Sequence, residues 1–145
     1  MGKRTDLTRK RVLVELDGLP ARVAEEFCKA WEPMSAALTE DQLITWTEAG
    51  IGLAKRTMRS WEAASQYFQV SPYVVGLMPF NYFVKWAESG LELSGASPVL
   101  ATAYFQASPG TMARLRSRHI ESWANMGHSL YRGTWKWGTL STKFF

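Results

Sequence analysis

Cysteine is almost absent from this chain of 145 residues, which contains only Cys28. A single cysteine cannot form an internal disulfide, and no cluster of Cys and His offers the four ligands of a structural zinc site. The sequence therefore predicts a domain that folds without crosslinks in a reducing compartment, which indicates the cytoplasm.

Long hydrophobic runs are missing as well. The longest apolar tract, residues 74–84, contains Pro79 and Asn81 and has about half of the roughly 20 residues that a membrane span needs. The basic N-terminus is followed by only a few apolar residues before Glu15, so it lacks the apolar region of a signal peptide. The sequence predicts neither a transmembrane helix nor secretion.

The sequence motifs of common enzymes are absent too. It contains no phosphate loop, no glycine fingerprint for dinucleotides, no nucleophile elbow and no zinc-protease helix. His119 and His128 are nine residues apart, which places them on opposite sides of a helix and argues against a shared metal site. We therefore expect a protein without catalytic, cofactor-binding or metal-binding residues.

Charge is unevenly distributed along a chain whose net charge is +4. Residues 1–11 and residues 94–145 are basic, whereas the segment between them is acidic. Basic ends are typical of proteins that bind nucleic acid or acidic membranes, but the solvated ends of a helical array have the same composition. The candidate basic contacts are Arg114, Arg116, Arg118, Arg132 and Lys136.

An internal repeat is the strongest feature that is present. The stretch YFQVSP at residues 67–72 returns as YFQASP at residues 104–109. A second pattern, an apolar residue followed by x-x-Trp-x-x-x-Gly-x-x-Leu, occurs three times, with its tryptophans 40 and 37 residues apart. The repeat residues are Trp46, Gly50, Leu53, Tyr67, Phe68, Pro72, Trp86, Gly90, Leu93, Tyr104, Phe105, Pro109, Trp123, Gly127 and Leu130.

The spacing within the Trp pattern places its four members on one stripe of an α-helix. Glycine in a helix costs about 1 kcal/mol relative to alanine, so its recurrence predicts close approach by the backbone of a neighbouring helix. Burial of each indole, worth on the order of 4–6 kcal/mol, outweighs that cost.

The Tyr-Phe pattern predicts two further helices in each unit. The aromatic pair is expected to end a short helix that begins near Ser60 or Ser97, and Ser-Pro at residues 71–72 and 108–109 is expected to start another. Ser97-Pro98 uses the same device, residues 39–42 form a capping box, and residues 109–132 are expected to form one helix.

The predicted fold is all-α: a short right-handed helical-repeat array of three units of about 37–40 residues with an N-terminal helical cap. The cap is residues 1–38, with helices over residues 6–19 and 20–37, and the repeats are residues 39–145. The last repeat is incomplete, so we expect a fragment of a longer protein; alternatively, the final helix packs inward. The residues expected to cover the first repeat are Val12, Val14, Leu16, Val23, Phe27 and Trp31.

The Trp, Gly and Leu order resembles the tetratricopeptide repeat, but that family has a period of about 34 residues. Residues 86–93, together with Tyr-Phe-x-x-Ser-Pro, resemble the N-terminal helical-repeat region of bacterial von Willebrand factor type A domain proteins related to nitric-oxide-reductase and rubisco activation proteins. The resemblance covers residues 43–145. It implies an adaptor segment that works with a MoxR-type AAA+ ATPase. The Asp-x-Ser-x-Ser metal motif of the type A domain is absent from this sequence.

These observations favour a non-catalytic helical scaffold or adaptor for protein partners, with an AAA+ ATPase and its target as the candidates. The alternative is a basic helical module that binds nucleic acid or an acidic membrane surface. Binding of that second kind weakens steeply as salt is added, which distinguishes the two hypotheses.

Overall fold

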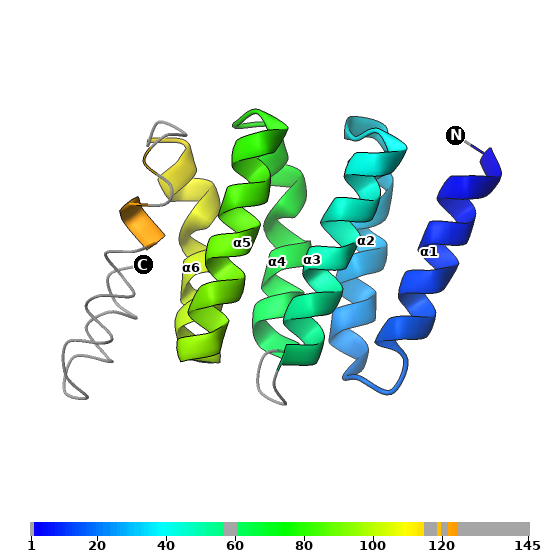
Figure 1. The fold of residues 1–145 in the computed structure, drawn as a ribbon, viewed down its shortest axis with the longest axis horizontal. Coiled ribbons are helices and arrows are strands. Elements are labelled where there is room, and N and C mark those ends of the chain that lie inside the picture. The colour runs from blue at the N-terminus through cyan, green and yellow to red at the C-terminus, as the bar shows by residue number, and fades with distance from the viewer. Residues whose placement is uncertain (1, 57–60, 115–118, 120–121, 125–145) are drawn as a thin grey trace.

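The computed structural model describes residues 2–56, 61–114, 119 and 122–124, and over these ranges the regular structure is helical (Figure 1). The predicted all-α fold class is confirmed. The six long helices are α1 (Gly2–Leu16), α2 (Ala21–Ala37), α3 (Glu40–Arg56), α4 (Trp61–Val75), α5 (Phe80–Ala96) and α6 (Pro98–Met112).

The helices form two layers with the hydrophobic core between them. Helices α1, α3 and α5 lie in one layer, and α2, α4 and α6 lie behind them in the second (Figure 1). The most extensive contacts join α2 to α4 and α4 to α6, while α3 packs on α4 and α5 on α6. Each Trp helix is thus paired with the Tyr-Phe helix that follows it. The repeat organisation of the array and its right-handed course stay predictions.

Local sequence signals set several helix ends. The Gln42 N–H donates to Thr39 Oγ1 at 3.2 Å and the Thr39 N–H donates to Gln42 Oε1 at 3.0 Å, which confirms the capping box at α3. Ser97 Oγ accepts from the Leu100 N–H at 3.4 Å at the start of α6. Gly18 has φ +85°, a conformation that lets the chain turn between α1 and α2.

The predicted breaks at Ser71-Pro72 and Ser108-Pro109 are wrong. Helix α4 continues through Pro72 to Val75, and α6 continues through Pro109 to Met112. Each unit therefore has two long helices instead of three. The expected helix over residues 109–132 is also wrong, because Pro109 lies inside α6 and that helix ends at Met112.

Packing explains why these prolines do not end the helices. Proline inside a helix costs about 3 kcal/mol. Burial of a large apolar side chain is worth about 1.5–3 kcal/mol, and Tyr67, Phe68 and Val74 of α4 are all fully buried on the two sides of Pro72. The Ser71 hydroxyl donates to the Tyr67 carbonyl, so the serine that was expected to cap a new helix bonds back into the old one.

The N-terminal helices cover the first Trp helix, with one exception to the prediction. Val14 is 73% exposed, although it was expected to be part of the cap. Val12 and Leu16 are four residues apart and share the buried face of α1, whereas Val14 lies midway between them and points away. The other five predicted cap residues, Val12, Leu16, Val23, Phe27 and Trp31, are buried.

Over the part of the chain that the structure describes, none of the helices combines the length and the apolar character needed to cross a bilayer.

Candidate functional site

The Trp stripe lies in the core. Trp46 on α3 and Trp86 on α5 are fully buried, and the apolar, Gly and Leu positions of both helices are buried with them. Trp123 is half-buried, and its ring centroid lies 4.9 Å from that of Tyr104. Gly127 and Leu130 lie outside the described residues. The stripe therefore has a packing role in both of the described copies.

The two halves of the repeat meet at the glycines. A Cβ atom at Gly50 would lie 2.1 Å from Cζ of Phe68, and a Cβ atom at Gly90 would lie 2.1 Å from Cζ of Phe105. The close neighbour is thus a phenyl ring, and not the helix backbone that the sequence led us to expect. This contact explains why the glycine and the Tyr-Phe pair recur together.

The tyrosine of each pair fastens its helix to the preceding Trp helix. The Tyr67 hydroxyl donates to the Trp46 carbonyl at 2.8 Å, and the Tyr104 hydroxyl donates to the Trp86 carbonyl at 2.9 Å. Burial raises the pKa of both phenols well above the ordinary value, although a hydrogen bond with Ser89 acts in the opposite direction at Tyr104. Both hydroxyls therefore remain protonated donors, with no acid–base role near neutral pH.

Aromatic contacts continue into α2, which the sequence interpretation treated only as a cap. The rings of Phe27 and Trp46 stack at 5.7 Å and 24°, and those of Tyr67 and Trp86 stack at 5.6 Å and 25°. Phe27 thus stacks on Trp46 in the same way that Tyr67 stacks on Trp86. A signal was present, because Phe27 precedes Tyr67 by 40 residues, the same interval that separates Trp46 from Trp86.

The two buried indoles differ in one hydrogen bond. Trp86 Nε1 donates to Ser108 Oγ at 2.8 Å, and Ser108 Oγ donates in turn to the Tyr104 carbonyl at 2.5 Å. Trp46 Nε1 is buried and has no hydrogen-bond partner among the described residues. The second unit therefore contains a polar link that the first unit lacks.

This difference predicts unequal effects of the same substitution. Trp86→Phe removes a buried hydrogen bond in addition to volume, whereas Trp46→Phe removes volume and an unpaired donor. We expect Trp86→Phe to lower the free energy of unfolding by about 1 kcal/mol more than Trp46→Phe does, measured by urea denaturation. Equal losses in the two variants would contradict the role of the Ser108 link.

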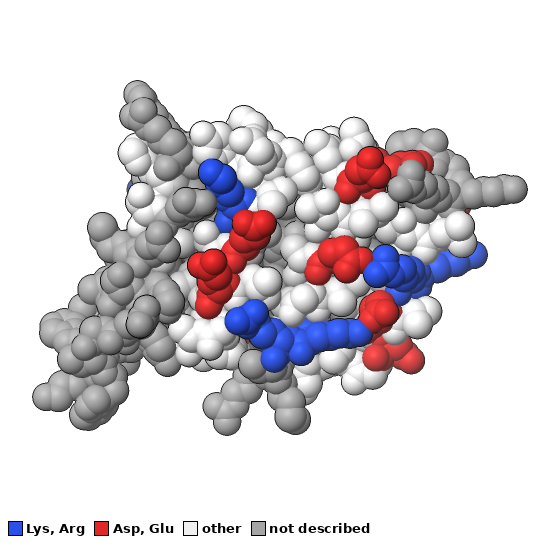
Figure 2. All heavy atoms as spheres, viewed as in Figure 1, with Lys and Arg blue, Asp and Glu red and all other residues white. Residues whose placement is uncertain are grey.

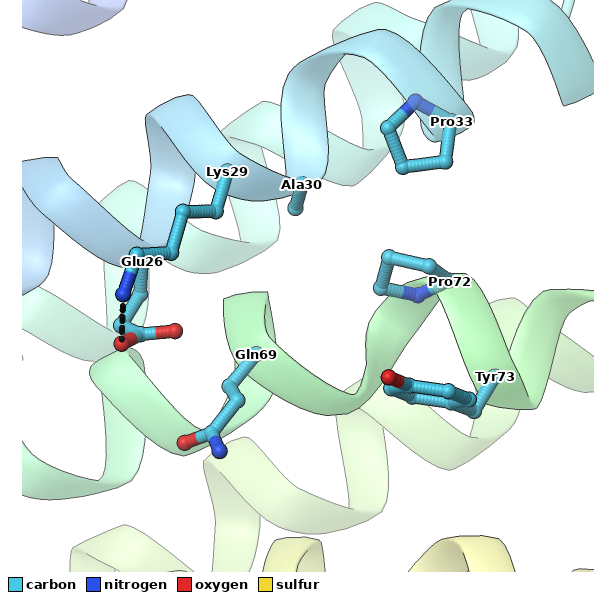
Figure 3. A pocket seen from close by; sticks show the side chains of 7 residues that line it. All are labelled: Glu26, Lys29, Ala30, Pro33, Gln69, Pro72 and Tyr73. Atoms are coloured by element: carbon cyan, nitrogen blue, oxygen red, sulfur yellow. Dashed lines mark ion pairs between the residues drawn. The ribbon is translucent and has the colours of Figure 1, made fainter.

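A surface groove lies between α2 and α4, and we call it the α2/α4 groove. It has a volume of about 310 Å³. Figure 3 shows its lining side chains, with Pro33 and Pro72 facing each other from the two helices and Tyr73 beside Pro72. Its lining residues are Glu26, Lys29, Ala30, Pro33, Gln69, Pro72 and Tyr73.

Gln69 of the repeated stretch lines this groove and is exposed. Tyr67, Phe68 and Ser71 are buried, but Gln69 is exposed, and so is Gln106 at the matching position of α6. The glutamine is the exposed residue of YFQxSP in both copies. Its recurrence therefore has no explanation in the core.

The groove offers groups that suit a polypeptide ligand. Proline has no N–H, so Pro33 and Pro72 leave the carbonyls of the residues four positions earlier without their usual helical donors. The Gln69 amide supplies both a donor and an acceptor, and Tyr73 is a 69% exposed aromatic side chain. Lys29 pairs with Glu26 across 3.6 Å at the opposite side.

The described residues give no geometry for catalysis or for the basic site. No group of three or more His, Cys, Asp or Glu residues that could hold a metal ion occurs among them. Of the candidate basic contacts, Arg114 is exposed just after α6. The other four, Arg116, Arg118, Arg132 and Lys136, lie outside the described residues.

Comparison with known proteins adds no relative. No protein-family model matches the chain, and no curated protein or solved structure matches it either. The resemblance to the helical region of type A domain proteins therefore stays a prediction.

Proposed function

We propose that this chain is a non-catalytic helical scaffold that binds a polypeptide partner through the α2/α4 groove and the adjoining surface of α6. The observation that carries the proposal is the exposed glutamine of the repeated stretch, Gln69 and Gln106. Both occupy equivalent positions on neighbouring helices, and neither contributes to the core.

The spacing of these glutamines suits an extended peptide that crosses the helices. Helices α4 and α6 pack against each other, and the axes of helices packed in this way lie about 8–10 Å apart. An extended chain advances about 3.3 Å per residue, so two glutamines on adjacent helices meet peptide groups about three residues apart. A glutamine side chain can donate to a backbone carbonyl and accept from a backbone N–H, which makes such contacts independent of the partner's side chains.

The first candidate partner is a MoxR-type AAA+ ATPase. This choice rests on the sequence resemblance of residues 43–145. The proposal also places the protein in the cytoplasm. The charge of the described helices gives no support to the nucleic-acid alternative. Residues 2–56 and 61–114 contain eleven Lys and Arg against twelve Asp and Glu, a net charge of −1.

The test measures binding of the purified chain to a purified MoxR-type AAA+ ATPase of the same organism by isothermal titration calorimetry. We expect the Gln69→Ala/Gln106→Ala double variant to bind roughly tenfold more weakly, because about two hydrogen bonds are lost. Asn81→Ala, which removes an exposed amide from α5 in the other layer, is the matched control and should bind normally.

Two results would contradict the proposal. One is an affinity that is the same in the double variant and in the Asn81 control. The other is binding to duplex DNA or to anionic vesicles at low salt that disappears at moderate salt, with no binding to the ATPase, which would favour the basic-module alternative.

A further inference from the structure

A second groove lies in the other layer, between α3 and α5, and we call it the α3/α5 groove. It has a volume of about 270 Å³. Its apolar walls include Ala49 of α3 and Val84, Ala87 and Leu91 of α5, and its rim includes Glu48 and Glu88. The proposed function does not use this surface.

Small side chains above a rigid floor create the groove. Trp46, Tyr67 and Phe83 line its base and are fully or almost fully buried, so their rings are fixed by the core. Ala49 and Ala87 are the small side chains of the lining, where larger residues would fill the space. The floor therefore cannot collapse to close the hollow without disturbing the aromatic packing.

The length of the groove matches a short helical ligand. Val84 and Leu91 are seven positions apart on α5, with Ala87 between them, which corresponds to about 10 Å, or two turns of helix. An apolar groove between two helices accepts the apolar face of an amphipathic helix, whose anchors recur at three- and four-residue intervals.

The rim of this groove is acidic. Glu48 and Glu88 are exposed on opposite sides at positions 40 residues apart, the interval of the repeat. Figure 2 shows this face of the molecule, where acidic groups lie in the central part with basic groups beside them. Glu88 forms no ion pair with any residue that the structure describes.

The basic neighbours of the rim do not neutralise it. Glu48 pairs with Arg11 at 2.6 Å, but both side chains are about half exposed, and such a pair contributes little and exchanges readily. Lys85 of α5 lies over the ring of Tyr82, 5.6 Å from its centroid. Glu88 therefore remains available to an incoming positive charge.

We propose that the α3/α5 groove binds a basic amphipathic helix, whose apolar side chains enter between Ala49 and Ala87 while flanking Lys or Arg residues pair with Glu48 and Glu88. This inference deepens the proposed function and rests on it, since it names the chemistry of a second partner contact on the opposite layer. The partner is a protein segment rather than nucleic acid, whose phosphates the two carboxylates would repel.

The probe for the experiment is a synthetic helical peptide with leucines along one face and lysines beside them, and its counterpart carries glutamate in place of lysine. Fluorescence anisotropy at low salt is expected to show binding of the basic peptide alone. Glu48→Gln/Glu88→Gln should weaken that binding about five- to tenfold. Glu25→Gln/Glu32→Gln, an identical charge change on exposed positions of α2, should leave it unchanged.

A groove-filling variant separates the apolar contact from the charges. Ala49→Gln places a longer neutral side chain in the hollow and is expected to weaken binding at least tenfold, with its fold verified by circular dichroism. The inference is overturned by equal weakening in the two double variants, by equal binding of both peptides, or by an absence of binding. A dimer that Ala49→Gln dissociates would assign the groove to a second copy and would also overturn it.

The result can be distinguished from the test of the proposed function. Gln69→Ala/Gln106→Ala lies in the other layer and should bind the basic peptide normally. Failure of the peptide to bind leaves the ATPase measurement unaffected, while failure of the ATPase measurement leaves the peptide result in place.

Discussion

Replacement of Trp86 with alanine is expected to lower the free energy of unfolding by about 3–5 kcal/mol. The indole is fully buried and contacts the rings of Tyr67, Phe83 and Phe105 at centroid distances of 5.6, 5.1 and 5.2 Å. Its removal leaves a cavity that these rigid rings cannot fill. It also removes the donor that reaches Ser108.

Urea denaturation followed by far-ultraviolet circular dichroism measures this loss. Trp61→Ala is the matched control, because the same side chain is only half-buried at the start of α4. The loss at Trp61 should be clearly smaller than the loss at Trp86. Similar midpoints for the two variants would show that the Trp stripe is not the centre of the core.

Gly90→Ala is the second substitution with a large expected effect, although it adds only a methyl group. The added Cβ would overlap the Phe105 ring, whose Cζ and Cε1 atoms would lie 2.1 and 2.7 Å away. Phe105 is fully buried, so its ring cannot move without displacing its neighbours. We expect a loss of about 1–3 kcal/mol from this overpacking, which exceeds the helix-propensity gain of about 1 kcal/mol.

Replacement of another helical glycine, Gly52, is expected to have the opposite effect on stability. A Cβ atom at Gly52, inside α3, would meet no atom of the described residues within 4 Å. Gly52→Ala should therefore stabilise the protein by about 0.5–1 kcal/mol, since alanine favours the helix and nothing obstructs it. Thermal melting of both variants checks the pair. Stabilisation by Gly90→Ala would contradict the described contact with Phe105.

Much of the fold could be predicted from the sequence because short-range signals determine it. The Trp stripe follows from helical spacing, and the Thr39–Gln42 capping box and the Ser97 cap depend on residues within four positions of each other. These elements lie where the sequence placed them.

The errors arose where tertiary packing overrides a local preference. Ser71-Pro72 has the sequence of a helix start, but the buried residues on both sides of Pro72 hold the helix together. The phenyl ring that packs against each glycine comes from another helix, so the local sequence around the glycine does not predict which residue it contacts. Neither surface groove was predicted from the sequence. A groove forms where two separate helices place small side chains next to each other, and this depends on how the helices pack. The exposed repeat glutamine was the available signal for the first groove.

The contacts between rings have a consequence for how the protein loses its structure. Phe27, Tyr67 and Tyr104 each lie against the indole of the next Trp helix, so no pair of helices contains its own complete aromatic cluster. In stacked helical arrays, the balance between the intrinsic stability of one unit and its coupling to neighbours decides whether the ends fray. Because these ring contacts join one helix pair to the next, we expect the described helices to melt cooperatively instead of unravelling one pair at a time.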